Sequence, residues 1–350
     1  MRQRGVCCLV MAGAIAVSLA GSAQAQSRYQ VLDIGTSAVD MNNMGQVLGL
    51  SSLWDATNGT RSLTPVPGQE TRAAEINDFG QVVGEYGDVL TPTGFIWDEV
   101  RGYRDLDTVT GLTSFIPEGI TNSGEIYGYS TEYHELSGLT YRRAAVWSPS
   151  SGVRYSSLLP TGINCSSVVM AMNDVGQGVA SYGRFPSDYR TTLWSPGSET
   201  QLEIPQAFWC YGLNNLGQAI WIDEDEMASG WLWTAEDGLR EMAGEGKFLH
   251  PCGTDINDLG QIVGVALDID EIETRFLWDE AHGYQDIADG VDPAMNLRFT
   301  PGAINNSGWI AGAGWMNGAW TGVLLVPVPE PGSLTLLAVG TVALLRRRRA

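Results

Sequence analysis

A nine-residue motif recurs seven times along the chain and constrains its fold more than any other feature. Two nearly identical copies run from Ile76 to Gly84 and from Ile256 to Gly264, and both read Ile-Asn-Asp-x-Gly-Gln-x-Val-Gly. Weaker copies begin at Met41, Ile120, Met172, Leu213 and Ile304. The first glycines of successive copies are on average about 44 residues apart. A repeat of this length with strand-like content predicts a propeller or another repeat array.

Each repeat contains signals for four short strands. The first strand ends at the Asn of the motif, and Asn-Asp-x-Gly forms a turn because Asn and Asp bond nearby amides and Gly tolerates positive φ. The second strand is Gln-Val-Val-Gly, the third ends in a tryptophan such as Trp97 or Trp278, and the fourth follows another turn. One such unit cannot bury both of its faces, so the units must stack. We therefore expect the tryptophans in the core between units.

Radial stacking of seven units predicts an all-β fold, a seven-bladed β-propeller with four-stranded blades. The last repeat has no fourth strand after Gly322 to Leu325, where the sorting segment begins. Tyr29 to Gly35 resembles the fourth strand at Tyr284 to Ile287, so we expect the N-terminal strand to complete the last blade. This closure removes an open sheet edge. An open, solenoid-like β array is the alternative.

Residues 1–25 have the three parts of a signal peptide in the expected order. Arg2 and Arg4 precede the apolar run from Val6 to Leu19, and a small-residue site predicts cleavage between Ala25 and Gln26. A buried N-terminal helix is the alternative. The repeat propeller is expected over residues 26–326.

Residues 327–350 have the pattern of a second targeting segment, at the C-terminal end of the chain. The segment Pro329-Glu330-Pro331 precedes an apolar run from Ser333 to Leu345 and then four arginines, Arg346 to Arg349. The run of about 13 residues is shorter than the roughly 20 that usually span a bilayer.

The order of proline-rich entry, short apolar run and basic end resembles the PEP-CTERM sorting signal of exopolysaccharide-producing Gram-negative bacteria. The resemblance implies secretion across the inner membrane and transient anchoring by a short transmembrane helix. It also implies processing by an exosortase near Pro329, Glu330 and Pro331, followed by release to the cell surface or extracellular matrix. A plain tail anchor is the alternative.

The charge balance limits the possible partners. The chain has 20 basic and 40 acidic residues, a formal net charge of −20. Such a charge keeps an exported protein soluble and argues against nucleic-acid or anionic-membrane binding. It would suit basic partners or divalent cations such as Ca²⁺, but surface solvation is the favoured interpretation. No other cofactor is expected.

Three cysteines remain after signal removal, Cys165, Cys210 and Cys252. Cys210 and Cys252 occupy similar places in adjacent repeats, so a disulfide between them is possible. Isolated cysteines without paired spacing do not indicate zinc.

The mature region also resembles the HAF-repeat family of secreted bacterial proteins. The resemblance lies in Ile76 to Gly84 and in Gly94 to Trp97, which match the family's Ile-Asn-x-x-Gly-Gln-Val-Val-Gly and Ala-Phe-x-Trp elements. The alanine of the second element is often replaced here. The family implies repeats and an extracellular location. It does not imply a known reaction, so no catalytic residue is carried over from it.

Loop lengths indicate where a ligand would bind. The first-to-second and third-to-fourth turns are nearly constant and lie on one face of the disc, which we call the constant face. The other connections vary and lie on the opposite, variable face, and variable loops on a rigid scaffold tend to carry binding sites. The candidate binding residues on three such loops are Tyr133, His134 and Tyr141, Asp223 and Asp225, and Asp268 and Asp270. Aromatic rings beside carboxylates could bind a sugar, and the carboxylates could hold Ca²⁺.

Signatures of catalysis are scarce, so no catalytic residue is assigned. The sequence has three histidines and lacks a Gly-x-Ser-x-Gly elbow, a His-Glu-x-x-His motif and a phosphate-binding glycine loop. The favoured hypothesis is a non-enzymatic, surface-sorted propeller that binds a matrix component such as exopolysaccharide or a surface protein. The alternatives are a polysaccharide hydrolase or lyase with carboxylates near the axis, and a purely structural matrix protein.

Overall fold

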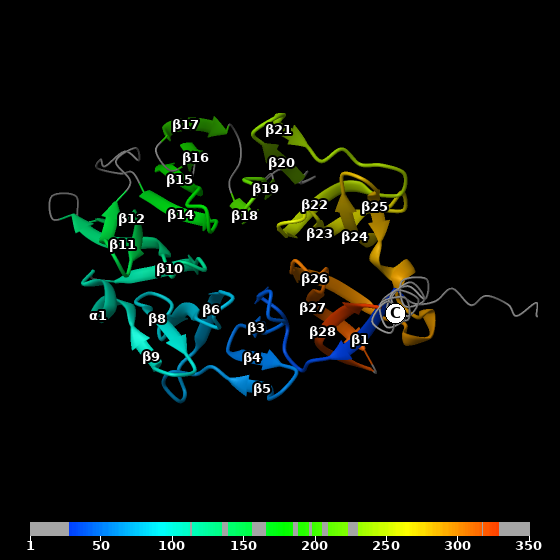
Figure 1. The fold of residues 1–350 in the computed structure, drawn as a ribbon, viewed down its shortest axis with the longest axis horizontal. Coiled ribbons are helices and arrows are strands. Elements are labelled where there is room, and N and C mark those ends of the chain that lie inside the picture. Colours follow the sequence, from blue (N-terminus) through cyan, green and yellow to red (C-terminus); the bar gives the residue numbers. More distant parts are fainter. Residues whose placement is uncertain are drawn as a thin grey trace, which may run out of the picture.

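Seven antiparallel sheets of four strands surround a central axis in the computed structural model (Figure 1), and the seven-bladed propeller is therefore confirmed. The structure describes residues 28–112, 114–134, 139–155, 166–184, 188–195, 198–204, 209–222, 230–316 and 318–328. We number the blades 1 to 7 in chain order. The first strand of each blade lies nearest the axis.

The first four blades each use four consecutive strands. Blade 1 contains β2 (Asp40–Met41), β3 (Val47–Gly49), β4 (Ser52–Asp55) and β5 (Gly59–Ser62). Blade 2 contains β6 (Thr71–Ile76), β7 (Val82–Tyr86), β8 (Thr93–Asp98) and β9 (Gly102–Asp105). Blade 3 contains β10 (Phe115–Ile120), β11 (Ile126–His134), β12 (Leu139–Ser148) and β13 (Gly152–Tyr155). Blade 4 contains β14 (Ser166–Met172), β15 (Gly178–Arg184), β16 (Asp188–Ser195) and β17 (Ser198–Ile204).

The last three blades follow the same plan, with one exchange at the end. Blade 5 contains β18 (Trp209–Leu213), β19 (Ala219–Ile222), β20 (Gly230–Thr234) and β21 (Gly238–Glu241). Blade 6 contains β22 (Leu249–Ile256), β23 (Ile262–Leu267), β24 (Glu273–Asp279) and β25 (Gly283–Asp286). Blade 7 contains β26 (Arg298–Ile304), β27 (Ile310–Met316), β28 (Ala319–Pro327) and β1 (Tyr29–Asp33). The described helices are short: α1 (Leu106–Thr110), η1 (Ile287–Gly290) and η2 (Pro293–Met295).

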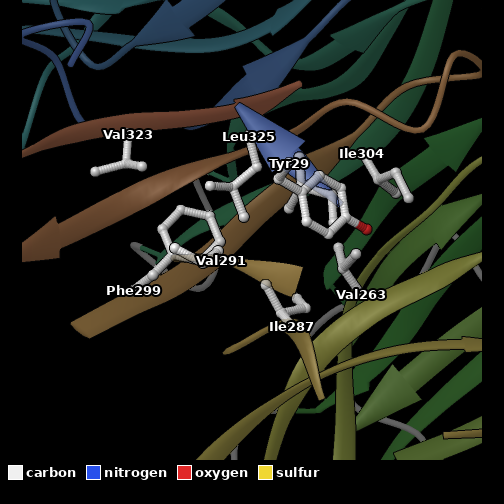
Figure 2. Close-up of a cluster of buried hydrophobic side chains, with 9 residues drawn as sticks. Tyr29, Val263, Ile287, Val291, Phe299, Ile304, Val323 and Leu325 are labelled. Carbon is white, nitrogen blue, oxygen red and sulfur yellow. The ribbon is translucent and has the colours of Figure 1, made fainter. Parts of the chain in front are cut away.

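Blade 7 is completed by the N-terminal strand, as predicted. Five residue pairs join β1 to β28, from Tyr29 opposite Pro327 to Asp33 opposite Val323. Tyr29 is buried in a cluster with Leu325, Phe299 and Ile287 of the last two blades (Figure 2). Burial of each such side chain stabilises the fold by roughly 1.5–3 kcal/mol. The two ends of the propeller are therefore held together by both a strand ladder and a shared core.

Core clusters join neighbouring blades. One of them unites Leu48 and Leu53 of blade 1 with Ile76 and Phe95 of blade 2. The recurrent tryptophan packs against such clusters while partly buried in most blades, as Trp97 does here, whereas Trp233 of blade 5 is a buried member of its cluster. The tryptophans therefore contribute to the core between blades, as expected, and most of them lie at its edge.

A β-bulge interrupts the inner strand of six blades, just before the repeat turn. In blade 2 the register shifts between Ala73 and Glu75, and in blade 6 between Gly253 and Asp255. A bulge adds one residue and re-aims the side chains beside it. In four of these strands, β6, β14, β18 and β22, two successive residues at the bulge consequently line the axial cavity, a feature that the two-residue period of a regular strand does not predict.

No disulfide joins Cys210 to Cys252. The expectation of a possible bridge is wrong: Cys210 lines the axial cavity and its thiol donates to the Gly212 carbonyl oxygen at 3.4 Å, whereas Cys252 does not line the cavity and its thiol donates to the His250 carbonyl oxygen. Burial raises the pKa of the Cys210 thiol to about 12. Cys165 lies outside the described residues.

Candidate functional site

The Asn of each repeat closes its own turn and reaches the next blade. Oδ1 of Asn257 accepts the N–H groups of Leu259 and Gln261, each at 3.0 Å, and its Nδ2 donates to Oε1 of Gln261 at 2.9 Å. The same Nδ2 donates to the Asn305 carbonyl oxygen of the next blade at 2.9 Å. Equivalent cross-blade bonds come from Asn42, Asn77, Asn173, Asn214 and Asn305. Thr121 replaces the Asn in blade 3.

The next residue of each repeat forms a second ring around the axial mouth on the constant face. Its members alternate between amide and carboxylate: Asn43, Asp78, Asn122, Asp174, Asn215, Asp258 and Asn306. Nδ2 of Asn122, for example, donates to Oδ2 of both Asp78 and Asp174, at 3.1 and 2.9 Å. Since seven is odd, strict alternation fails once, where Asn306 donates its N–H to Oδ1 of Asn43 at 2.9 Å. No two carboxylates of the ring are neighbours.

Three acids lie directly below this mouth, each one residue before a copy of the motif. Oδ2 of Asp40 accepts the Ile76 N–H of blade 2 at 2.8 Å. Oδ2 of Asp255 accepts the Ile304 N–H of blade 7 at 2.7 Å. Glu75 uses Oε2 for the Ile120 N–H of blade 3. These acids therefore bond one blade to the next while facing the axial cavity.

Glu75 has the most crowded position of the three. Its Oε2 accepts from the Ile120 N–H at 2.7 Å and from the Tyr127 hydroxyl at 2.6 Å. A Cβ added to Gly119 would lie 1.7 Å from this oxygen, so the glycine makes room for the carboxyl group. Among the described residues, none donates a hydrogen bond to Oε1 of Glu75.

Burial and mutual repulsion favour the protonated forms of these acids. Burial, together with the nearby Asp40 and Asp255 charges, raises the pKa of Glu75 to about 8, against the lowering effect of the hydrogen bonds from Tyr127 and Ile120. Burial likewise raises the pKa of Asp255 to about 7 and that of Asp40 to about 6. The part of the cavity below the mouth is thus acidic, and its three carboxyl groups gain or lose protons near neutral pH.

The axial cavity has a volume of about 300 Å³ and is lined mainly by polar groups of the inner strands. The bulged residues that reach its wall differ from blade to blade: Ala74, Glu118, Met170, Tyr211, Thr254 and Gly302. Burial raises the pKa of Glu118 to about 7, against the lowering effect of the Arg142 charge. No hydrogen bond or ion pair joins Glu118 to another residue in the described part of the chain.

An apolar rim surrounds the mouth. The third residue of the turn is a large, exposed apolar side chain in five blades: Met44, Phe79, Val175, Leu216 and Leu259. Exposed apolar side chains that gather in one place mark interaction surfaces. The constant face thus combines an acidic centre with an apolar border.

The candidate residues taken from the variable loops do not form one site. Tyr133, His134 and Tyr141 lie in the β11–β12 hairpin of blade 3, where Tyr133 is exposed. Asp268 and Asp270 lie in the β23–β24 turn of blade 6, and blades 3 and 6 are not adjacent.

Asp268 has a local role. Its Oδ1 accepts the N–H groups of Asp270 and Ile272, each at 2.8 Å, which is the chemistry of a turn. Asp223 and Asp225 lie outside the described residues, as do Ala25, Gln26, Pro329, Glu330 and Pro331.

Blade 7 exposes an aromatic pair on the variable face that sequence reasoning missed. Trp315 and Trp320 are directly opposite each other across the β27–β28 hairpin, and they are 48% and 58% exposed. Arg298 of β26 is opposite Trp315 on the other side. Residues directly opposite in an antiparallel ladder share one face of the sheet, so the three side chains form an exposed row, which we call the tryptophan shelf.

Both missed features had a sequence signal. Asp40, Glu75 and Asp255 occupy the position before the motif, where other repeats have Gly or Ala, so an alignment of the seven repeats separates them from the other acids. Trp315 and Trp320 flank a short turn and stand apart from the recurrent tryptophan position.

Within the described residues, no group of three or more His, Cys, Asp or Glu side chains is placed to share a metal ion. The same part of the chain contains no helix that is long and apolar enough to span a bilayer. The apolar run from Ser333 to Leu345, for which a short transmembrane helix is expected, lies outside it.

Residues 327–349 match the PEP-CTERM protein-sorting motif. The match indicates an exported protein that is sorted to the cell surface through an exosortase. It covers the sorting segment alone and leaves the repeat region without a family assignment. No curated protein matches the sequence.

Several solved propellers resemble the fold. A streptogramin B lyase aligns with 86% of this chain and 98% of its own, at 11% identity and a TM-score of 0.48. The β-propeller domain of the Trilobed protease from Pyrococcus furiosus aligns with 71% of this chain and 79% of its own, at 11% identity and a TM-score of 0.42. Aleuria aurantia lectin aligns with 74% and 96%, at 9% identity and a TM-score of 0.38.

Proposed function

We propose that this protein, once exported and sorted to the cell surface, binds an extracellular polysaccharide without cleaving it. The tryptophan shelf is the observation that carries the proposal. Large aromatic side chains are normally buried or used in contacts, and two of them side by side at the surface offer a flat, rigid platform. The C–H faces of a pyranose ring pack on such a platform.

The position of the shelf supports this function. Trp315 and Trp320 lie in a second-to-third strand hairpin, on the variable face where the loop lengths predict binding. Arg298 beside them can donate up to five hydrogen bonds to hydroxyl or carboxylate oxygens of a sugar chain. The HAF-type resemblance of the repeats supports an extracellular location. Release of the protein by cleavage near Pro329, Glu330 and Pro331 is part of the proposal.

Co-sedimentation of the full chain with exopolysaccharide from a Gram-negative producer tests this function, with and without Ca²⁺. We expect the double variant Trp315→Ala, Trp320→Ala to bind at least about tenfold more weakly, a loss of about 1.4 kcal/mol. Val100→Ala removes an even more exposed apolar side chain from the constant face and should bind like the wild type. Thermal melting of both variants shows whether the fold is retained.

Equal binding by the folded double variant would refute the shelf as the site. Binding lost instead in Tyr133→Ala would move the site to blade 3. No co-sedimentation of the wild-type chain would favour a surface-protein partner or a structural role.

A second candidate function is a polysaccharide hydrolase or lyase that acts at the axis. The observation that favours it is the meeting of Asp40, Glu75 and Asp255 at one cavity, because acid–base cleavage of glycosides uses two carboxyl groups with different proton affinities. New reducing or unsaturated chain ends in the same tubes, abolished by Glu75→Gln, would establish it. Their absence while the chain co-sediments would leave the binding function.

A further inference from the structure

We propose that the axial cavity binds a small amine, whose ammonium group donates to Oε1 of Glu75 and whose second donor group reaches Glu118. The inference is independent of the polysaccharide function. It concerns the constant face and the axis, whereas the tryptophan shelf lies on the variable face.

Unsatisfied carboxyl oxygens on the cavity wall carry this proposal. The Oδ oxygens of Asp40 and Asp255 accept backbone N–H groups, so those two acids have structural partners. Oε2 of Glu75 accepts hydrogen bonds from the Ile120 N–H and the Tyr127 hydroxyl, and its Oε1 has no donor among the described residues. Glu118 has no hydrogen-bond partner there at all, although it lies largely withdrawn from solvent. These carboxyl groups border the axial cavity, so a ligand there can donate hydrogen bonds to them in place of water.

The chemistry of the wall favours a cation over an anion or a neutral ligand. Asp40, Glu75, Glu118 and Asp255 all line the cavity, and Asp78, Asp174 and Asp258 surround its mouth. The other titratable groups on the wall are Tyr127, Cys210 and Tyr211, none of which can carry a positive charge. Burial raises the pKa of Tyr127 and of Cys210. No Lys, Arg or His contributes to the described lining. The Arg142 charge acts on Glu118 from outside this lining, so an incoming positive charge meets no other cation on the described wall.

An ammonium group fits better than a divalent metal. Ca²⁺ needs six to eight oxygen ligands close together, and the described acids include no group of three placed to share a metal. An ammonium group needs only acceptors, and it offers three donors. With about 300 Å³, the cavity is at the small end of ligand pockets and holds a monosaccharide or a short diamine.

Calorimetric titration of the full chain with matched pairs of ligands tests the proposal. Glucosamine is compared with N-acetylglucosamine, and 1,4-diaminobutane with 1,4-butanediol, because each pair differs in the charged amine. We expect at least one amine to bind, and its neutral counterpart to bind about tenfold more weakly or worse. Binding of glucosamine would identify an amino sugar as the source of the ammonium group, and binding of 1,4-diaminobutane would identify a linear polyamine.

Variants locate the site. Glu75→Gln and Glu118→Gln keep the shape of the side chains and remove their charge, so each should weaken binding by about tenfold or more. Glu236→Gln makes the same chemical change at an exposed position and should bind like the wild type. Binding should also release protons near neutral pH, because a cation lowers the pKa of partly protonated carboxyl groups. Buffers of different ionisation enthalpy reveal this release.

Three results would overturn the proposal. The first is equal affinity for the amines and their neutral counterparts, and the second is undiminished binding by both Glu75→Gln and Glu118→Gln. The third is Ca²⁺ binding that Glu75→Gln abolishes while neither amine binds, which would make the cavity a metal site.

Discussion

At the scale of single residues, the repeat motif is a set of contacts between blades as much as a turn. Each Asn forms hydrogen bonds within its own turn and donates one to a backbone carbonyl oxygen of the next blade. The glycine three positions later packs closely against a side chain of the preceding blade. Gly80 has a φ of +70°, and a Cβ there would lie 3.1 Å from Oε1 of Gln46 in the preceding blade. Asn, Gly and Gln recur together because all three take part in the same contact between neighbouring blades.

Asn257→Ala is expected to lower the free energy of unfolding by about 3 kcal/mol. The change leaves the Asn305 carbonyl oxygen and the Leu259 and Gln261 N–H groups without their partner, and unsatisfied buried groups cost about 1–3 kcal/mol each. Urea denaturation measures the loss. Leu259→Ala alters an exposed side chain of the same turn and should stay within about 0.5 kcal/mol of wild type. Similar effects of the two substitutions would contradict the role given to Asn257.

At the scale of strands, the inner strand and the N-terminal strand carry the unusual features. The bulges bring two successive residues of an inner strand to the axis, which is how Glu75 and the bulged residue Ala74 both line one cavity. The N-terminal strand β1 covers β28, which would otherwise leave open backbone groups at the sheet edge. The bulges of the inner strands thus shape the cavity, and the pairing of β1 with β28 closes the ring.

Deletion of residues 28–33 is expected to destabilise the protein by more than about 3 kcal/mol and to promote aggregation. The deletion removes the five-pair ladder to β28 and the buried Tyr29 side chain, and loss of a large aromatic side chain from a core alone costs about 3–5 kcal/mol. Thermal melting and light scattering measure the two effects. Gln30→Ala, an exposed change in the same strand, is the control. A melting temperature unchanged by the deletion would show that β1 does not close the ring.

At the scale of the whole molecule, ring closure gathers charges that are far apart in the chain. Asp40, Glu75 and Asp255 come from blades 1, 2 and 6, yet the Asp40 charge raises the pKa of both other acids and the Asp255 charge raises that of Glu75. The alternating ring above them comes from all seven blades. The axial cavity is therefore a property of the closed propeller and of no single repeat.

Stability is expected to fall between about pH 5 and pH 8 through these acids. Their pKa values are near 4 in an unfolded chain and are raised to about 6, 8 and 7 in the folded protein. The folded state thus binds more protons, and its advantage is full below the unfolded values and lost as the pH rises through the folded ones. Relative to wild type, Glu75→Gln should gain about 2 kcal/mol or more from pH 5 to pH 8 in urea denaturation. Glu236→Gln should follow the wild-type profile, and a parallel profile for Glu75→Gln would mean that Glu75 ionises like an exposed acid.

The sequence by itself determined the repeat, the four strands of each blade, the closure by β1 and the sorting segment. These follow from local patterns: turn chemistry at Asn-x-x-Gly, apolar runs of strand length, and the fourth strand missing from the last repeat. Only the tertiary structure decided the candidate sites. Glu75 and Glu118 are two acids among 40 until bulges turn them to a common axis. Trp315 and Trp320 become a shelf only when the register of β27 and β28 places them opposite each other. A local pattern fixes which residues form a strand, whereas a site depends on distances between strands, and those are set by how the blades pack and close.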